Sequence, residues 1–397
     1  MNFSHNSIDT EYDVIVVGAG PAGLNATLNL HKLGSNQLKI ALLDKRDPWR
    51  EPVACAEAVH NKGLHSLVEV NPKWIRSVVD GVYLVSPDGT KVKYTDRDSG
   101  LILDRALMHY ELAQRCQEGG AHCHFRSRVT KVTPKENGLR EVHAKIDGEE
   151  KVLKAKLIID AAGAGPSLSK EEGLLSEHFD VEPAVFALVK GIPCESNMIE
   201  MYFGETYAPG GYAWVFPRDE EWSNVGIVVG REYLKTHPPR KMYRKFMDRF
   251  APDAEEQTLH GGPISCGQPL ETIAKDGLFK TGDAADFVNP ISRAGILEAM
   301  RGGELAAQGG MKYLADTEAD HTETYETYRK EWMEDKGLGH RKLAEGKKAF
   351  SSISDKTLDR AARKLAKIPD HKRTMFRIFW ATFTSNPLIL WKMRSLM

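Results

Sequence analysis

Three glycines near the N-terminus have the spacing of a phosphate-binding turn. Gly18, Gly20 and Gly23 follow the apolar run 14–17 in the order G-x-G-x-x-G, where a buried strand is expected to turn into a helix. The first glycine permits the tight turn, the second lets a pyrophosphate approach the backbone, and the third lets the helix pack on the strand. The N–H groups of the first helical turn, near Ala22, then face the phosphate charge.

An acidic residue stands where such a turn contacts a ribose. A second apolar run, residues 39–43, ends in Asp44, whose carboxylate can accept a hydrogen bond from a ribose hydroxyl. Chance produces a triple-glycine pattern, but here the strand, the helix and the terminal acid occur together. The chain is therefore predicted to begin with a Rossmann-like dinucleotide-binding domain.

Two later turns offer further contacts to the same ligand. A buried strand predicted at 157–159 runs into a small-residue turn at 160–165 that contains Gly163, and a strand near 277–281 runs into Gly282 and Asp283. Ligands of open α/β sheets bind outside the carboxyl ends of the strands, which makes these residues candidate contacts. Packing glycines and an N-cap aspartate are the alternative interpretations.

Arg105 opens a helix that the sequence predicts over 104–118, directly after an apolar strand. Arginine is usually a solvated surface residue. At the start of a helix that follows a strand, however, its guanidinium can reach a bound nucleotide.

The pattern changes to short β signals in the middle of the chain. Aromatic and β-branched runs between 185 and 265 are separated by Gly, Pro and Asn turns, which predicts a mainly antiparallel domain inserted into the first. The predicted boundaries are 1–180 and 267–315 for the nucleotide-binding domain, 181–266 for the substrate domain, and 316–397 for a C-terminal helical region. The expected fold class is thus α/β, Rossmann-like, with an inserted β domain.

Two antiparallel features are expected before residue 160. Asp88-Gly89 lies between apolar runs and predicts a hairpin, because this dipeptide supplies the required turn conformations. Residues 129–156 alternate apolar and polar side chains, as a small antiparallel meander does.

Aromatic residues alternate in one of the β runs. Tyr212, Trp214 and Phe216 are two residues apart, so that all three side chains fall on one face of a strand. They are expected to line either the core or an apolar pocket.

Composition excludes several classes of protein. The chain has 397 residues, 41% hydrophobic content, 27% charged residues and a net charge of −1, which gives no bias towards nucleic acid. Its five cysteines form no C-x-x-C pair, which favours a reducing compartment and disfavours zinc or any other metal site. No apolar run reaches the roughly 18 residues that span a bilayer. We expect a cytoplasmic protein.

The C-terminal segment is basic. Residues 341–397 contain 14 Lys+Arg against four Asp+Glu, interleaved near the end with Phe376, Phe379, Trp380 and Trp391. A helical segment of this composition suits peripheral contact with a membrane surface. Docking of the rings onto the protein's own core is the alternative.

Taken together, these motifs resemble the glutathione-reductase-type FAD flavoproteins of the hydroxylase group. More narrowly, the segments PVACAEAV (52–59), APGGYAWVFP (208–217) and NVGI (224–227) resemble the geranylgeranyl reductase family, whose Y-x-W-x-F-P signature matches Tyr212 to Pro217. The resemblance covers about residues 12–310. It implies FAD as cofactor and reduction of isolated C=C bonds in polyprenyl chains.

The resemblance also assigns roles to individual positions. Cys55, Tyr212 and Trp214 are the implied catalytic residues, and Phe216 joins the last two in lining the prenyl cavity. Gly295 and Ile296 are expected under the flavin ring, and Cys55 in a segment that approaches it. The full implied cofactor-binding set is Gly18, Gly20, Ala22, Gly23, Asp44, Lys45, Cys55, Ala56, Arg105, Val129, Gly163, Gly282, Asp283, Gly295 and Ile296.

An isolated alkene has no carbonyl to polarise it. The expected route is therefore protonation of the double bond coupled to hydride delivery from reduced flavin, which needs a dry cavity and a nearby acid. Aromatic walls exclude water and favour a developing cation. Cys55, Tyr212 or a bound water could be the acid, and the sequence does not choose among them.

Other functions remain open at this stage. An FAD-dependent aromatic monooxygenase shares the fold, and a non-catalytic flavin electron-transfer protein is a second alternative. A free prenyl diphosphate, a glycerolipid, a quinone tail and a chlorophyll side chain all fit as substrate. The external electron donor, NAD(P)H or a ferredoxin, is also undetermined, because no second glycine fingerprint is present.

Overall fold

The computed structural model describes residues 8–47, 49, 53–168, 180–374 and 377. The chain divides into two compact units, each assembled from three stretches of sequence. Unit 1 comprises Met1–Glu51, Ala106–Phe179 and Ser265–Arg341, and unit 2 comprises Pro52–Arg105, Asp180–Ile264 and Lys342–Met397.

These divisions differ from the boundaries expected from sequence in two respects. The expected C-terminal region 316–397 is divided between the units at residue 341, and residues 52–105, expected in the nucleotide-binding domain, group with unit 2. The physical reason for the placement of residues 52–105 is a parallel pairing of strand β4, Ile75–Val85, with strand β11, Met198–Phe203. That pairing adds the predicted hairpin to the sheet of unit 2, and the hairpin itself is confirmed by the antiparallel pairing of β4 with β5, Lys91–Leu103.

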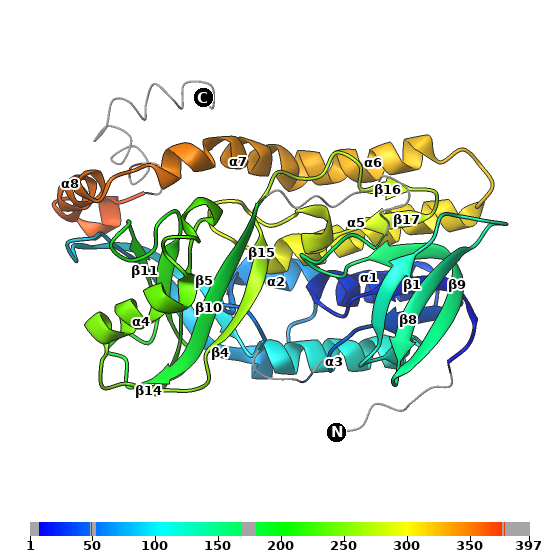
Figure 1. Cartoon of the computed structure of the whole chain (residues 1–397), viewed down its shortest axis with the longest axis horizontal. Helices are drawn as coiled ribbons and strands as arrows, with labels where there is room; N and C mark the ends of the chain where they lie inside the picture. Colours follow the sequence, from blue (N-terminus) through cyan, green and yellow to red (C-terminus); the bar gives the residue numbers. More distant parts are fainter. Residues whose placement is uncertain (1–7, 48, 50–52, 169–179, 375–376, 378–397) are drawn as a thin grey trace. The chain divides into compact units, whose positions relative to one another are not determined.

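Unit 1 has a central sheet with helices packed on it (Figure 1). Its strands are β1 (Glu11–Val17), β2 (Ile40–Leu43), β6 (His122–His124), β7 (Arg128–Val132), β8 (Arg140–Ile146), β9 (Glu149–Asp160), β16 (Ala274–Lys275) and β17 (Leu278–Lys280). Its helices are α1 (Pro21–Leu33), α3 (Arg105–Glu118), α5 (Ile296–Ala315) and α6 (Thr322–Trp332).

The sheet of unit 1 has the strand order of a Rossmann fold. The order is β16-β17-β9-β1-β2-β6, and the pairs β17–β9, β9–β1, β1–β2 and β2–β6 are parallel. Numbered along the chain, the parallel strands therefore read 5-4-1-2-3. Strands β7, β8 and β9 pair antiparallel, as the predicted meander requires. The α/β fold class is confirmed.

Small residues let two helices of unit 1 pack very closely. A Cβ on Gly303 of α5 would lie 2.2 Å from the backbone oxygen of Ala22 in α1. The amide of Asn25 in α1 donates a 2.7 Å hydrogen bond to the carbonyl of Met300. These contacts fix the start of α1, and with it the glycine turn, against α5.

Unit 2 is built around a mainly antiparallel sheet with the order β14-β10-β13-β12-β11-β4-β5-β3, and β15 pairs with β10. The remaining strands are β3 (Ala58–His60), β10 (Val181–Lys190), β12 (Tyr212–Pro217), β13 (Trp222–Val228), β14 (Glu255–Glu256) and β15 (His260–Ser265). Its helices are α2 (Asn61–Leu67), α4 (Pro239–Phe250) and α8 (Asp355–Ala366), and α7 (Leu338–Ser351) begins in the last residues of unit 1.

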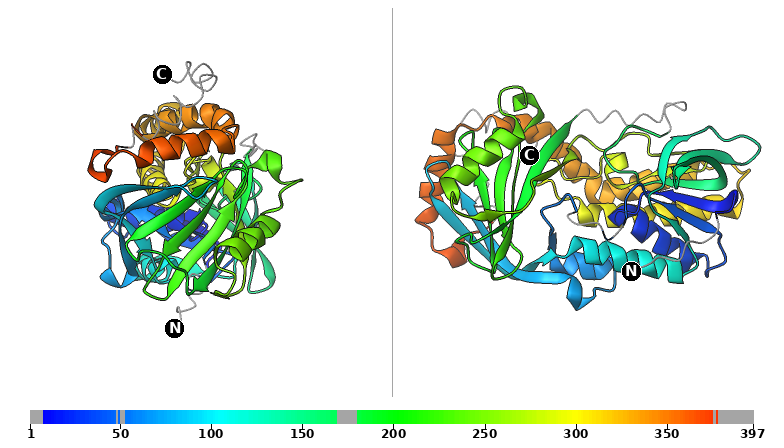
Figure 2. Two further views of the ribbon diagram at one scale, coloured as in Figure 1. Left: turned by 90° about the vertical axis from the view of Figure 1, so that its left-hand side faces the viewer. Right: turned by 60° about the horizontal axis from the view of Figure 1, so that its bottom comes forward.

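The two faces of this sheet pack against different partners. On one face, helix α4 lies along the sheet (Figure 2), and its Tyr243 and Phe246 belong to one core cluster with Ala213 and Val215 of β12. On the other face, Tyr212, Trp214 and Phe216 belong to a separate cluster, which we call the aromatic face. Its other buried members are Val79, Ile102, Ala184, Phe186 and Val228. The predicted one-sided alternation of the three rings is therefore present.

The helical character expected near the C-terminus is present where the structure describes the chain. Helix α6 continues through a π-helical turn, Met333–Gly337, into α7, and α8 follows. The interleaved rings Phe376, Phe379, Trp380 and Trp391 lie outside the described residues. Across the described ranges, none of the helices has the length and apolar character that crossing a membrane requires.

A buried ion pair ties α7 to the sheet of unit 2. Lys347 Nζ lies 2.8 Å from Glu182 Oε1 and 2.7 Å from Asp180 Oδ2, and the Glu182 side chain is 0% exposed. Removing one partner leaves the other charge buried and unpaired, so Lys347→Ala should lower the free energy of unfolding by about 3–5 kcal/mol. Urea unfolding measures this, with the exposed neighbour Lys348→Ala as control. Equal unfolding midpoints for the two variants would show that the pair contributes nothing.

Candidate active site

The glycine turn of unit 1 is closed by backbone contacts that leave no room for side chains. Gly18 has φ +105°, and a Cβ there would lie 2.2 Å from the carbonyl oxygen of Ala161 in the turn after β9. A Cβ on Gly23 would lie 1.8 Å from the oxygen of Gly18. Gly20 is different, because a Cβ there meets no protein atom within 4 Å. The backbone at Gly20 therefore faces open space beside the start of α1.

Asp44 is held by the same turn. Its Oδ2 accepts a 2.6 Å hydrogen bond from the Ala19 N–H, and its Oδ1 accepts one of 2.7 Å from the Arg46 N–H. A carboxylate oxygen can accept a second bond, so these contacts orient Asp44 and leave capacity for a ribose hydroxyl. Lys45, next to it, is exposed.

The later turns converge on the start of α1. Gly282 has φ +60° at the head of a short 3₁₀ turn, and a Cβ there would lie 3.0 Å from the Cβ of Ala22. Ala22, Ala161 and Ala299 form a cluster of small buried side chains. Three segments that are distant in sequence therefore meet at one edge of the sheet, where the parallel strands end.

Asp283 and Gly295 are also brought together there. A Cβ on Gly295 would lie 3.9 Å from Asp283 Oδ1. Gly295 is the N-cap residue of α5 and Ile296 its first residue, so the positive end of the α5 dipole is at this place. Gly163 has φ +83°, and a Cβ there would meet nothing within 4 Å.

This edge of unit 1 fits the ADP half of an FAD molecule. Gly20 and Gly163 present open backbone, the N-termini of α1 and α5 offer N–H groups to anionic groups, and Asp44 can accept from a hydroxyl. Val129 lies in β7, where it packs against a core cluster of unit 1. No group of histidine, cysteine or carboxylate side chains suited to a metal occurs among the described residues.

In unit 2, Cys55 is surrounded by hydrogen-bond donors. The Arg105 guanidinium donates from Nη1 to Cys55 Sγ at 3.1 Å, and the Glu57 backbone N–H donates to the same sulfur at 3.1 Å. The cysteine is only partly buried, while Arg105 is 5% exposed. Two donors aimed at one sulfur hold it in one position. The structure thus places Arg105 at Cys55 within unit 2.

The aromatic face adjoins this cysteine segment. The Tyr212 and Trp214 ring centroids are 6.2 Å apart in an edge arrangement, and those of Trp214 and Phe216 are 6.3 Å apart. Ala56 and Ala58, on either side of Glu57, pack against the same cluster. Side chains of unit 2 therefore combine an apolar aromatic wall with a thiol-bearing turn.

Three polar residues of this region had no role assigned from sequence: Glu57, Arg218 and Asn224. Glu57 Oε2 lies 3.0 Å from Arg218 Nε, and both side chains are less than 10% exposed. Burial is the main influence on the Glu57 carboxyl and raises its pKa to about 7. The sequence holds one signal, since Asn224 follows Ser223 as a polar residue in a strand that is otherwise apolar.

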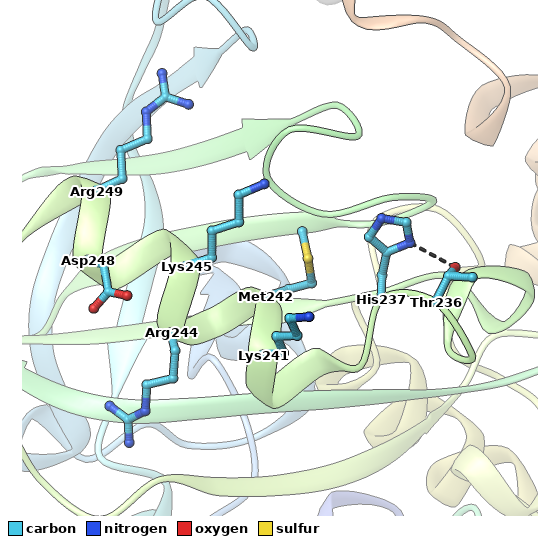
Figure 3. A pocket seen from close by; sticks show the side chains of 8 residues that line it. All are labelled: Thr236, His237, Lys241, Met242, Arg244, Lys245, Asp248 and Arg249. Atoms are coloured by element: carbon cyan, nitrogen blue, oxygen red, sulfur yellow. Dashed lines mark hydrogen bonds between the residues drawn. The ribbon is translucent and has the colours of Figure 1, made fainter.

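The pocket shown in Figure 3 is not this site. It has a volume of about 700 Å³ and is lined by Thr236, His237, Lys241, Met242, Arg244, Lys245, Asp248 and Arg249. Helix α4, which supplies most of these side chains, covers the sheet face opposite the aromatic face. A pocket walled by charged side chains cannot hold a polyprenyl chain in a dry environment.

Comparison with known proteins identifies the chain. The family model of the geranylgeranyl reductase catalytic domain matches residues 180–262, and that of lycopene cyclase protein matches residues 13–180. The digeranylgeranylglycerophospholipid reductase of Methanosarcina acetivorans is 30% identical over 393 residues, covering 97% of this chain and 96% of the relative. The chain belongs to the geranylgeranyl reductase family. The Methanosarcina mazei reductase of the same name is likewise 30% identical, over 97% of this chain and 96% of its own.

Solved structures agree on the fold. A geranylgeranyl bacteriochlorophyll reductase-like protein from Thermoplasma acidophilum superposes with a TM-score of 0.85 at 24% identity, covering 98% of this chain and 99% of the other. The flavin-dependent halogenase CmlS has a TM-score of 0.69 at 17% identity, covering 95% of this chain and 71% of its own. This geranylgeranyl reductase is therefore an FAD-dependent oxidoreductase that reduces C=C bonds of geranylgeranyl groups, and the halogenases share only its fold.

Proposed function

We propose that this geranylgeranyl reductase acts on a glycerophospholipid that carries geranylgeranyl chains. The observation that carries the proposal is the match, over 97% of the chain, to reductases named for digeranylgeranylglycerophospholipid. A free prenyl diphosphate, a prenylated quinone and a geranylgeranylated chlorophyll are the competing substrates.

The side chains of unit 2 suit the chemistry of an isolated alkene. When bound, reduced FAD supplies the hydride. The aromatic face excludes water, and the π faces of Tyr212 and Trp214 favour positive charge as it develops on the protonated alkene. The Cys55 thiol and the Tyr212 hydroxyl are the proposed proton-holding groups, and Arg105 holds the Cys55 sulfur in place.

An anaerobic single turnover tests the proposed function. The protein is reduced with dithionite and mixed with an unsaturated digeranylgeranyl phospholipid, while flavin absorbance and the mass of the lipid are followed. Reoxidation with a gain of two hydrogens per double bond supports the proposal. Faster reoxidation by geranylgeranyl diphosphate or a prenylated quinone would reassign the substrate, and reduced flavin that persists until oxygen enters would favour a monooxygenase.

Cys55→Ser is expected to keep FAD and lose most of its turnover, because a serine hydroxyl neither ionises nor donates its proton as a thiol does. FAD absorbance per chain and the single-turnover rate measure the two effects. The partly buried Cys194, which contacts Ser223 at 3.5 Å, provides the matched control Cys194→Ser. Wild-type turnover in Cys55→Ser would remove the thiol from the mechanism.

We also propose a separate electron donor and contact with an anionic membrane surface. The donor is NAD(P)H or a ferredoxin, which stopped-flow reduction with each distinguishes. Two basic regions support the membrane contact: residues 341–397, and the exposed side of α4, where Lys241 and Lys245 have no ion-pair partner within the described ranges. Equal co-sedimentation of wild type and Lys241→Glu/Lys245→Glu with anionic vesicles would exclude α4 from the contact.

A further inference from the structure

One buried amide joins the cysteine segment to the aromatic face. Asn224 is 0% exposed, and its Oδ1 accepts a 2.9 Å hydrogen bond from Trp214 Nε1. Its Nδ2 donates to the carbonyl oxygen of Cys55 at 2.8 Å and to Glu57 Oε2 at 3.4 Å. A single side chain thereby contacts the indole, the cysteine backbone and a carboxylate.

Glu57 makes the remaining contacts of this arrangement, to the Cys55 sulfur and to Arg218. Its backbone has φ +71°, a region that non-glycine residues rarely adopt, and from there its N–H reaches the Cys55 sulfur. Its carboxylate pairs with Arg218 at 3.0 Å. The strained backbone and the ion pair together determine where the Cys55 thiol lies.

Stability alone does not require these residues. A buried amide or ion pair is often replaceable by apolar side chains of similar volume at little cost, whereas such groups define one arrangement among several. Asn224 shares its face of β13 with Gly226 and Val228, and the cluster packed on that face is mainly apolar, so an aliphatic side chain would fit a purely structural role there. The polar contacts instead fix two groups to which the proposed function gives chemical tasks.

We propose that Asn224 and Glu57 are positioning residues of the reduction, which hold the Cys55 thiol and the Trp214 indole in one fixed arrangement. The inference rests on the proposed function for its effect on turnover, but the positioning itself can be measured without it. Two further residues then influence the reaction, and its rate depends on the ionisation of Glu57.

The pH dependence follows from the groups around the Glu57 carboxyl. Burial raises its pKa to about 7, against the lowering influence of Arg218, Asn224 and Arg105, and Asp104 raises it further. The ionised form is the one that pairs with Arg218 and accepts from Asn224. As pH rises through about 7, more molecules carry the ionised carboxylate and with it the ordered arrangement. The plot of kcat against pH should therefore have an ascending limb near pH 7.

Glu57→Gln tests the proposal, since it keeps the side-chain volume and removes the charge. We expect kcat to fall on the order of 10–100-fold, the limb near pH 7 to disappear, and KM and FAD content to stay within about twofold. The exposed Glu220→Gln, on the neighbouring β12–β13 turn, is the matched control. A Glu57→Gln enzyme that keeps both the wild-type kcat and the wild-type limb overturns the proposal.

A second readout is independent of turnover. In a Cys194→Ser background Cys55 is the only cysteine that is not buried, so the rate of iodoacetamide alkylation reports on its thiol. Glu57→Gln and Asn224→Ser should each change this rate several-fold, and Asn224→Ser should also shift tryptophan fluorescence. Unchanged alkylation in both variants contradicts the positioning role. If alkylation changes while wild type reduces no prenyl lipid, the proposed function fails and the positioning role stands.

Discussion

Gly20→Val is expected to abolish FAD binding while the protein remains folded. A Cβ at this position meets no protein atom within 4 Å, and its φ of −80° is accessible to any residue. The Cβ therefore clashes with nothing in the free protein, and the two methyl groups extend outward from it. They do occupy the open space in front of the helix N-terminus, where a pyrophosphate must approach the backbone.

The neighbouring fingerprint glycine should behave in the opposite way. A Cβ on Gly23 would lie 1.8 Å from the Gly18 oxygen and 3.3 Å from the Val16 side chain. Backbone cannot move aside cheaply, so Gly23→Ala should destabilise unit 1 by several kcal/mol, in the range of severe core mutations. Loss of FAD in this variant follows from loss of the fold.

Two measurements separate the variants. Bound FAD is quantified from flavin absorbance per chain, and unfolding is followed by circular dichroism in urea after FAD has been removed from all samples. We expect Gly20→Val to match the apo wild type in its unfolding midpoint and to retain less than about a tenth of the FAD, since 1.4 kcal/mol is a tenfold change in affinity. A Gly20→Val protein that copurifies with full FAD would place the pyrophosphate elsewhere.

Local patterns predicted unit 1 well because its determinants are short-range. The glycine spacing and Asp44 lie within one strand–helix–strand segment, and the contacts of Gly23 and Asp44 are with neighbours in that segment, whereas Gly18 packs against Ala161. The one-sided alternation of Tyr212 and Trp214 is likewise a property of a single strand. Periodicity carries this kind of information without knowledge of the partners.

The polar contacts of unit 2 depend on pairings that no local pattern encodes. Asn224 and Glu57 are separated by 167 residues in sequence. Their contact depends on a chain of strand pairings in unit 2, β3 with β5, β5 with β4, β4 with β11, β11 with β12 and β12 with β13. The assignment of residues 52–105 to unit 2 depends similarly on the parallel pairing of β4 with β11. Glu57 also relies on a backbone conformation that is uncommon for its type. Sequence reasoning identified Cys55 and Trp214 but not the residues that connect them.

Gly226→Ala is expected to disable the aromatic face while FAD binding is retained. Gly226 pairs with Trp214 across β12 and β13, and the indole lies over it. A Cβ there would come within 2.2 Å of Trp214 Cζ2 and 2.6 Å of the Val185 oxygen. The strand is held on both sides, so the indole must move, and its hydrogen bond to Asn224 is lost.

The cost should appear in both stability and turnover. Overpacking of this kind costs about 1–3 kcal/mol, and misplacement of a group beside the reacting atoms lowers turnover on the order of 100-fold. FAD content should stay at the wild-type value, because the fingerprint glycines belong to unit 1. Gly339→Ala, where a Cβ meets nothing within 4 Å, is the control for substitution of a glycine by alanine.

A double-mutant cycle identifies the indole as the cause. Trp214→Phe alone removes the N–H donor and leaves space, so Gly226→Ala on that background should cost less than it does in wild type, with a coupling energy of about 0.5–3 kcal/mol. Turnover should not recover, because the phenyl ring cannot bond Asn224 and the Cys55 turn loses its link to the aromatic face. Additive effects of the two substitutions would mean that the strain falls on the Val185 backbone instead. If the double variant regains stability but not turnover, the loss of stability in Gly226→Ala comes from overpacking of the aromatic face, and the loss of turnover comes from the displaced indole.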